Sequence, residues 1–241
     1  MNQFLAPDLA AQWGDLLPYL IVAGGGLLVL MVDAFVKTLK KDHLSYLALF
    51  VLLGAIVVQI VSRGGDSVLL NGMMISSDFT RFFNFLFCGI GVMTVIFATG
   101  LYDREGKYRP EFYPLVLFAV LGMMVLAAAN DLMTLFLGLE TMSMAVYVLV
   151  GGVRGNVRSA EAGFKYLVLG GFSSAILLMG MALIYGFAGG TGFEDIALAM
   201  RSKDPEVLIV SLGMALMLVS FGFKVALVPF HMWTPDVYDG A

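Results

Sequence analysis

The sequence predicts an all-α fold, a polytopic bundle of helices that crosses a membrane several times. Of the 241 residues, 60% are hydrophobic and only 13% are charged. A soluble domain carries about 25% charged residues, so these side chains cannot cover a globular surface that faces water. A helix needs about 20 apolar residues to cross the hydrocarbon core, which leaves room for about seven spans. The small net charge of −4 is spread along the chain and argues against a nucleic-acid partner.

Seven apolar runs are long enough to cross the bilayer as helices. The predicted spans cover residues 16–36, 45–62, 82–101, 112–129, 132–150, 166–187 and 207–228. Little more than Asn130 and Asp131 separates the fourth run from the fifth, which predicts an antiparallel pair of helices. The segment 67–79 is too short to cross and is expected to form a hairpin at the surface.

Basic residues between the spans predict the orientation of the chain. The richer set of loops contains Lys37, Lys40, Lys41, Arg104, Lys107, Arg109, Arg154 and Arg158, and the opposite set contains Arg63, Arg81, Arg201 and Lys203. Cytoplasmic loops carry the excess of Lys and Arg, so the N-terminus is expected outside and residue 241 on the cytoplasmic side. The N-terminal segment lacks the basic region and cleavage site of a signal peptide, so the first span is expected to be retained.

One carboxylate lies deep inside the fifth predicted span. The charged residues nearest to Glu140 in sequence are Asp131 and Arg154. An ionised group at this depth costs roughly 2.5–3.5 kcal/mol on insertion scales. On a helix, Ser143 and Tyr147 share the face of Glu140, and this face should point to protein or to a water-filled cavity. Either the acid is neutral and hydrogen-bonded to a neighbour, or its charge has a function.

The seventh predicted span contains a lysine near its end, in the run SFGFKVALVPFHMW. Pro229 lacks an N–H, and its ring would clash with the carbonyl of Val225 in a helix. We therefore predict a break between Lys224 and Pro229, of a kind that is tolerated where the backbone lines a cavity or is buried in protein. A buried lysine beside freed carbonyl groups is suited to carry a proton. The alternative is a lysine that extends to the cytoplasmic headgroups.

Two further residues are candidate proton carriers. Lys165 opens the sixth predicted span four residues after Glu161, which is also the spacing of an ordinary solvated ion pair. His231 follows Lys224 by seven residues, so it shares the face of the lysine only if the helix continues unbroken. A histidine titrates close to physiological pH and could relay protons, although an interfacial position beside Trp233 is an equal alternative.

Glu140 and Lys224 are predicted to act together. An acid on one helix and a base on another offset the cost of each other's burial. A nearby carboxylate favours the charged form of a lysine, and desolvation disfavours it. Moving the two groups apart would therefore release the lysine's proton. We predict that they lie on facing helices at similar depth, within direct or one-water reach.

The sequence shows no motif for binding a nucleotide, a redox cofactor or a metal. It lacks a P-loop, a dinucleotide glycine pattern, a CxxC set and a His/Glu metal spacing. The single cysteine, Cys88, lies inside an apolar run and is expected to serve in packing. We expect no redox cofactor in this chain.

Three stretches resemble a known family. They are FLGLETMSMAVYVLVG at 136–151, EAGFKYLVLGGFSSAILLMGMALIYGFAGGTG at 161–192 and FKVALVPFHMWTPDVYDGA at 223–241. They are similar to the subunit N family of bacterial NADH:quinone oxidoreductase (respiratory complex I), one of the antiporter-like membrane subunits. The resemblance covers most of residues 112–241, whereas the first 110 residues match only in layout.

The resemblance implies a membrane-arm subunit with two inverted helical repeats. Residues 1–110 would hold the first three helices, and residues 111–241 would hold the first repeat up to a broken helix seven. Glu140 and Lys224 would match the family's key glutamate and lysine, and Lys165 and His231 would match further residues of its proton path. Family members are about twice as long, so the chain is expected to be an N-terminal fragment that ends before helix eight.

The resemblance also implies a translocase that couples electron transfer from NADH to quinone with proton pumping. NADH, FMN, iron–sulfur clusters and quinone would be bound by partner subunits, and this chain would hold no cofactor. Its partners would be the other membrane-arm subunits and the lipid bilayer of the bacterial inner (plasma) membrane. Two alternatives remain: a subunit of an Mrp-type cation/proton antiporter, and a purely structural membrane subunit.

Overall fold

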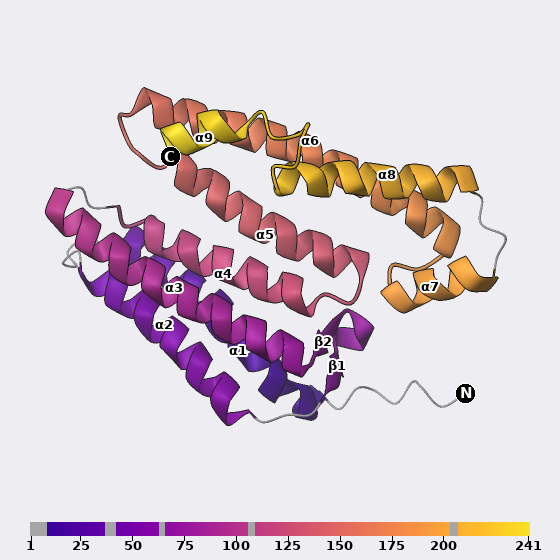
Figure 1. Ribbon diagram of the computed structural model, residues 1–241. Coiled ribbons are helices and arrows are strands. Elements are labelled where there is room, and N and C mark those ends of the chain that lie inside the picture. Colours follow the sequence, from indigo (N-terminus) through magenta and orange to yellow (C-terminus); the bar gives the residue numbers. More distant parts are fainter. Residues whose placement is uncertain (1–8, 37–41, 63–65, 106–108, 203–206) are drawn as a thin grey trace. The chain divides into compact units, whose positions relative to one another are not determined.

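The computed structural model describes residues 9–36, 42–62, 66–105, 109–202 and 207–241, and most of these residues are helical (Figure 1). Five helices are long and apolar enough to cross a membrane; they contain Gln12–Phe35, His43–Val61, Asp78–Leu101, Leu132–Val150 and Val157–Ala188. Two shorter apolar helices, Phe112–Ala128 and Leu208–Lys224, occupy the other two predicted spans. The predicted all-α, multi-pass helix bundle is therefore confirmed.

The chain divides into two compact units. The first consists of Met1–Ala129 and Leu137–Ala145, and the second consists of Asn130–Phe136 and Val146–Ala241. Helix α5 (Leu132–Val150) therefore contributes to both units. The division at residue 110 that the family resemblance implies is a different one, and it stays a prediction.

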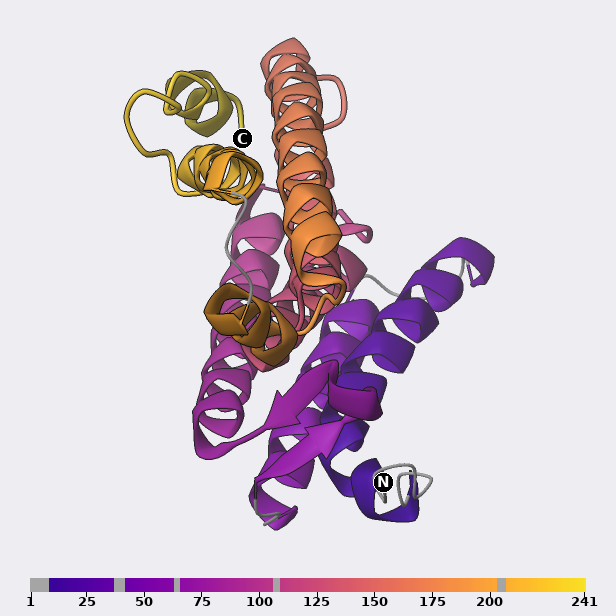
Figure 2. The ribbon, with the colours of Figure 1, turned by 90° about the vertical axis from the view of Figure 1, so that its right-hand side faces the viewer.

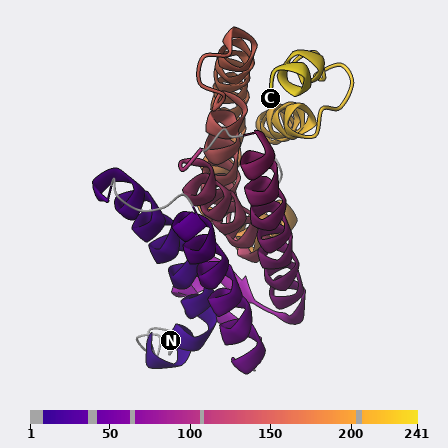
Figure 3. The same ribbon diagram turned by 90° about the vertical axis from the view of Figure 1, so that its left-hand side faces the viewer.

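The first unit is built from α1 (Leu9–Phe35), α2 (Asp42–Val61), α3 (Asp78–Glu105) and α4 (Phe112–Ala128). Helix α2 packs between α1 and α3, and α4 packs on both of these helices (Figure 3). The core includes the fully buried side chains of Val22, Leu52, Val95 and Leu117. Because apolar side chains gain little by leaving lipid for such a core, close packing and interhelical hydrogen bonds must hold the helices together.

A β-hairpin connects α2 to α3, as the sequence predicts for this segment. Strands β1 (Ser67–Leu69) and β2 (Met74–Ser76) pair antiparallel, and Figure 2 shows them side by side. The connection is a turn of 3-10 helix, η1 (Leu70–Gly72), inside which Asn71 has a left-handed φ of 56°. The hairpin is not confined to the surface, because Leu69 and Met74 are buried. These two side chains give the strands an apolar inner face.

The second unit contains α6 (Val157–Ala188), α7 (Phe193–Ser202), α8 (Val207–Lys224) and α9 (Thr234–Gly240). Helices α6 and α8 run antiparallel, because Ser173 contacts Ser220 while Gly180 contacts Gly213 (Figure 1). An added Cβ on Gly180 would lie 2.7 Å from the carbonyl oxygen of Gly213. Small residues thus let the two backbones approach closely, as is typical of membrane helices.

Two details of the second unit differ from the sequence predictions. Helix α6 begins at Val157, so Lys165 lies inside the helix and does not open it. The short helix α7 was not predicted as an element. Its first turn carries Glu194 and Asp195 and its last turn carries Arg201, which suits the helix dipole.

Candidate functional site

Helix α8 breaks where the sequence predicts. Its last helical residue is Lys224, residues 225–233 form turns, and α9 begins at Thr234. The end falls directly before Val225, the residue whose carbonyl the ring of Pro229 would meet in a continuous helix. The Val228–Pro229 peptide bond is cis. The predicted interruption between Lys224 and Pro229 is confirmed.

The end of α8 is closed by its own backbone. The N–H of Ala226 donates to the carbonyl of Phe223 at 3.1 Å, and the N–H of Leu227 donates to that of Gly222 at 2.8 Å. This is the Schellman pattern, with Ala226 at the left-handed position at a φ of 54°. Glycine is the usual residue there, and alanine costs roughly 1–2 kcal/mol. These two bonds satisfy the carbonyls of Phe223 and Gly222. They do not involve the carbonyl of Val225, to which Pro229 has no N–H to donate, so the expectation of a freed carbonyl beside the lysine stays a prediction.

The amine of Lys224 lies among hydroxyl groups from two other helices. Its Nζ donates to the Tyr147 hydroxyl of α5 at 2.9 Å and to the Ser174 hydroxyl of α6 at 3.4 Å. Ser174 itself donates to the carbonyl of Gly170 at 3.0 Å, which leaves its lone pairs to accept from the lysine. The lysine is half-buried, whereas Tyr147 and Ser174 are buried.

An aromatic stack connects this amine to the segment after the break. The ring of Tyr147 lies 4.6 Å from that of Tyr166, and Tyr166 stacks on Trp233 at 4.6 Å and 12°. The indole N–H of Trp233 donates to the carbonyl of Phe223 at 3.2 Å, so a side chain from beyond the break also satisfies the helix end. Trp233 is buried together with Val150, Ala162 and Val237. The stack holds the ring of Tyr147 and the turn segment in fixed positions.

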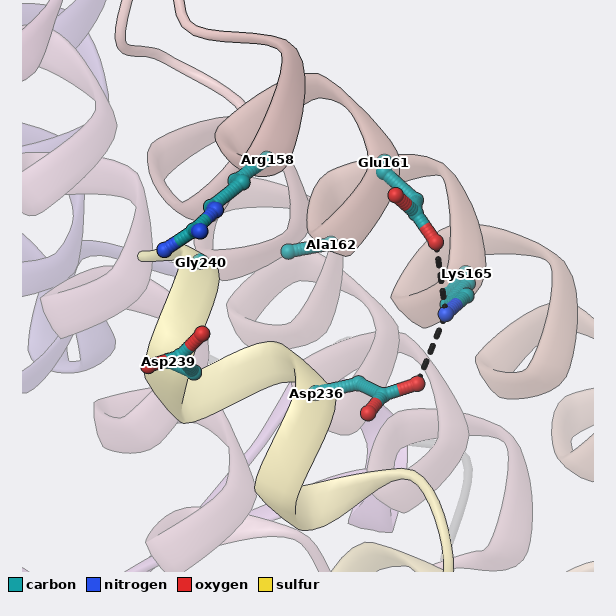
Figure 4. A pocket seen from close by; sticks show the side chains of 7 residues that line it. All are labelled: Arg158, Glu161, Ala162, Lys165, Asp236, Asp239 and Gly240. Atoms are coloured by element: carbon teal, nitrogen blue, oxygen red, sulfur yellow. Dashed lines mark hydrogen bonds and ion pairs between the residues drawn. The ribbon is translucent and has the colours of Figure 1, made fainter.

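Lys165 lies between two carboxylates, as Figure 4 shows. Its Nζ is 2.8 Å from Glu161 of the same helix and 2.7 Å from Asp236 of α9 (Figure 4). All three side chains are partly exposed. They border a cavity of about 310 Å³ that is lined by Arg158, Glu161, Ala162, Lys165, Asp236, Asp239 and Gly240. The sequence indicated the ion pair between Lys165 and Glu161. It gave no local signal for Asp236, which lies 71 residues after Lys165.

The two other candidates lie in different surroundings. His231 belongs to the turns after the break and is exposed, and its carbonyl accepts from the N–H of Thr234 at 3.0 Å. Because α8 ends at Lys224, the histidine does not share a helix face with the lysine. Glu140 is half-buried on α5, along which Ser143 and Tyr147 are buried. The pairing of Glu140 with Lys224 stays a prediction.

Within the described ranges, no group of three or more His, Cys, Asp or Glu side chains is placed to hold a metal ion. The arrangement around Lys224 is instead suited to holding and releasing a proton, because hydroxyl groups can both accept and donate hydrogen bonds. Sequence reasoning placed Tyr147 on the face of Glu140 but not among the site residues. It missed Ser174 altogether.

Two solved structures share the fold. Respiratory complex I from Thermus thermophilus with bound aureothin contains a chain that is 30% identical, with a TM-score of 0.75; the match covers 93% of this chain and 47% of that one. A chain of the membrane-bound sulfane sulfur reductase, an archaeal respiratory membrane complex, superposes with a TM-score of 0.80 over 95% of this chain and 48% of that one. Its identity of 23% shows the fold alone.

Sequence comparisons agree with these structures. Residues 129–241 match the family model described as NADH:quinone oxidoreductase/Mrp antiporter, TM. The proteins named NADH-quinone oxidoreductase subunit N from Trichlorobacter lovleyi and Desulfitobacterium hafniense are each 41% identical, over 94% and 92% of this chain. The matches cover 47% and 45% of those proteins, so the chain spans about half their length. This multi-pass membrane chain is thus homologous over nearly its whole length to the proteins named subunit N, and it belongs to their family of antiporter-like membrane subunits.

Proposed function

We propose that this chain belongs to a proton-translocating membrane-arm subunit of NADH:quinone oxidoreductase in the bacterial inner membrane. The observation that carries the proposal is the position of Lys224. It ends an apolar helix at a break, and its amine is bonded to hydroxyl groups of two other helices. An ionisable residue within a membrane helix is energetically costly, and such residues mark the paths of ions and protons. The names of the relatives support the same function.

In this proposal Lys224 carries the proton and Glu140 controls it. The charge of the glutamate favours the protonated lysine, and its withdrawal or neutralisation favours release. Lys165 and His231 would lie on the route between this lysine and the water. NADH, FMN, iron–sulfur clusters and quinone would belong to other subunits, which would drive the movement of protons in this one.

The proposed orientation follows the basic loops, with the N-terminus outside and residue 241 on the cytoplasmic side. Several of the residues on which it rests, Lys37, Lys40, Lys41, Arg63, Lys107 and Lys203, lie outside the described residues. Arg109, Arg154 and Arg158 lie within them. Membrane-impermeant labelling of single cysteines at Arg154 and Arg201 in intact cells would test this orientation, since the two positions should label from opposite sides.

One alternative has an observation in its favour. The family model that matches residues 129–241 is shared by NADH:quinone oxidoreductases and Mrp antiporters. A subunit of an Mrp-type antiporter would exchange sodium or potassium for protons without oxidising NADH. Purification of the intact complex, followed by assays of NADH oxidation and of cation-dependent proton exchange, separates the two functions.

The decisive variant is Glu140→Gln in the full-length protein within its complex. The amide keeps the shape of the side chain but removes its charge, so proton uptake and NADH oxidation should fall together. A tenfold fall corresponds to about 1.4 kcal/mol on the barrier, and we expect an effect of at least this size. Both activities are measured in inverted vesicles, with assembly of the complex measured separately. A fully assembled variant with unchanged turnover and proton gradient would refute the role of Glu140 and favour a purely structural subunit.

A further inference from the structure

The group nearest to the amine of Lys224 among its described partners is the hydroxyl of Tyr147, at 2.9 Å. We propose that Tyr147 is a further residue of the proton-carrying site, which keeps Lys224 hydrogen-bonded both with and without its proton. This inference rests on the proposed function, in which Lys224 gains and loses a proton. It adds a residue that a search for charges alone does not find.

A hydroxyl group is suited to this role because it can reverse the direction of its hydrogen bond. The charged ammonium has only donors, so the Tyr147 oxygen accepts from it. When Lys224 passes a proton to a water molecule, one N–H bond breaks and the nitrogen keeps the electron pair. The O–H of Tyr147 then turns towards this lone pair, and the phenol keeps its own proton throughout. The neutral amine therefore keeps a hydrogen-bond donor for its lone pair, which avoids the free-energy cost of an unsatisfied acceptor.

The ring of Tyr147 is held by its surroundings, so only the hydroxyl hydrogen has to rotate when Lys224 gains or loses its proton. The residue is only 3% exposed, and its ring packs against Tyr166. Gly170 makes room for the phenol oxygen, because an added Cβ at this position would overlap it. Ser174 is less suited to the same role, since its hydroxyl donates to the carbonyl of Gly170 and its oxygen is further from the lysine.

The test is Tyr147→Phe in the full-length protein within its complex, with Tyr166→Phe as the matched control. Each variant removes one hydroxyl from the same aromatic stack and leaves the ring in place. The first readout is NADH-driven proton uptake in inverted vesicles. The second is the rate at which acetic anhydride acetylates Lys224, measured by mass spectrometry, because only the neutral amine reacts.

Loss of the hydroxyl removes a stronger bond from the ammonium than from the amine, since hydrogen bonds to charged groups are about twice as strong. We expect Tyr147→Phe to slow proton uptake and to speed acetylation of Lys224, each by roughly fivefold, with neither change in Tyr166→Phe. An assembled Tyr147→Phe complex in which either readout equals that of the parent overturns the inference. The same two changes in Tyr166→Phe would also overturn it, because the effect would then come from packing.

A second variant covers the case in which Tyr147→Phe fails to assemble. Gly170→Ala displaces the phenol oxygen from the lysine without deleting it, and the same two readouts and the same expected directions apply. Failure of the proposed function is distinguishable from failure of this inference. If Lys224→Ala and Glu140→Gln both pump normally, the proposed function fails, whereas loss in those variants with normal Tyr147→Phe removes only the role of the tyrosine.

Discussion

Two lysines of the second unit lie in contrasting surroundings. Lys224 ends α8, and the partners described for it are hydroxyl groups. Lys165 lies on α6 between the carboxylates of Glu161 and Asp236, at the edge of an open cavity. A carboxylate only accepts hydrogen bonds and is negatively charged, so two of them strongly favour the charged form of the lysine. A hydroxyl group can bind either form, so the two hydroxyl groups described beside Lys224 are compatible with the loss of its proton. The contrast distinguishes the lysine that we propose as the proton carrier from one whose charged form is favoured by two ion pairs.

The largest effect is expected from Lys224→Ala in the full-length protein, and Lys165→Ala is the variant to compare with it. Lys224→Ala should reduce proton uptake and NADH oxidation in inverted vesicles by tenfold or more, the effect of about 1.4 kcal/mol on a barrier. Lys165→Ala should reduce both by no more than about threefold, because less than 1 kcal/mol of barrier is then lost. An equal loss in the two variants, with normal assembly, would remove the distinction between them.

The sequence alone predicts much of the surroundings of Lys224. Pro229 predicts the break in α8. Lys224 is a candidate because the sequence has no other Lys, Arg, Asp or Glu between Glu206 and Asp236. The closure of the helix end was not predictable, because the left-handed position is occupied by Ala226 where the motif usually has glycine. The bonds to Tyr147 and Ser174 were also hidden, since hydrogen bonds between helices depend on packing and leave no periodic signal.

The surroundings of Lys165 were predicted less completely. The four-residue spacing to Glu161 identified one ion pair. Asp236 could not be assigned, because its approach depends on the break that lets α9 pack on α6. The hydrophobic pattern gave the long helices and the hairpin at 67–79, but α7 is short and only partly apolar, so a search for membrane spans passes over it.

The second prediction concerns Trp233, which contacts a sequence neighbour of each lysine: it stacks on Tyr166 and donates a hydrogen bond to Phe223. Trp233→Phe keeps an aromatic ring for stacking on Tyr166 but removes the indole N–H that donates to the carbonyl of Phe223. Loss of one such bond costs about 1 kcal/mol, so turnover should fall by roughly threefold to fivefold. The midpoint of thermal unfolding of the purified complex should fall as well.

The control for this variant is Phe223→Leu, which leaves the backbone carbonyl and the indole donor in place. It should not reproduce the loss of turnover. A Trp233→Phe complex with parental turnover and thermal midpoint would show that the hydrogen bond to the helix end has no role in positioning Lys224.

A third and smaller effect is expected from Asp236→Asn. Lys165 would keep Glu161 at 2.8 Å, so the lysine should stay charged and turnover should change by less than about twofold, as is common for exposed ion pairs. A double-mutant cycle sharpens the comparison. If Lys165 and Asp236 act only on each other, the double variant should lose no more activity than Lys165→Ala alone. A much larger loss in the double variant would give Asp236 a separate function at the cavity.

The smallest effect is expected from His231→Ala. The family resemblance implies a role for this histidine in the proton path, but its side chain is exposed in the turns after α8. Water can therefore reach the position and carry protons in place of the imidazole, so proton uptake should stay within about twofold of the parent, less than 0.5 kcal/mol of barrier. Met232→Ala is the matched control, because it truncates an exposed neighbour in the same turns. A tenfold loss of uptake in His231→Ala, with a normal Met232→Ala complex, would make the histidine an obligatory relay. The path of the proton from Lys224 to water would then include a side chain of the turns after α8. The proton-carrying site would thus include His231 in addition to the hydroxyl groups of Tyr147 and Ser174.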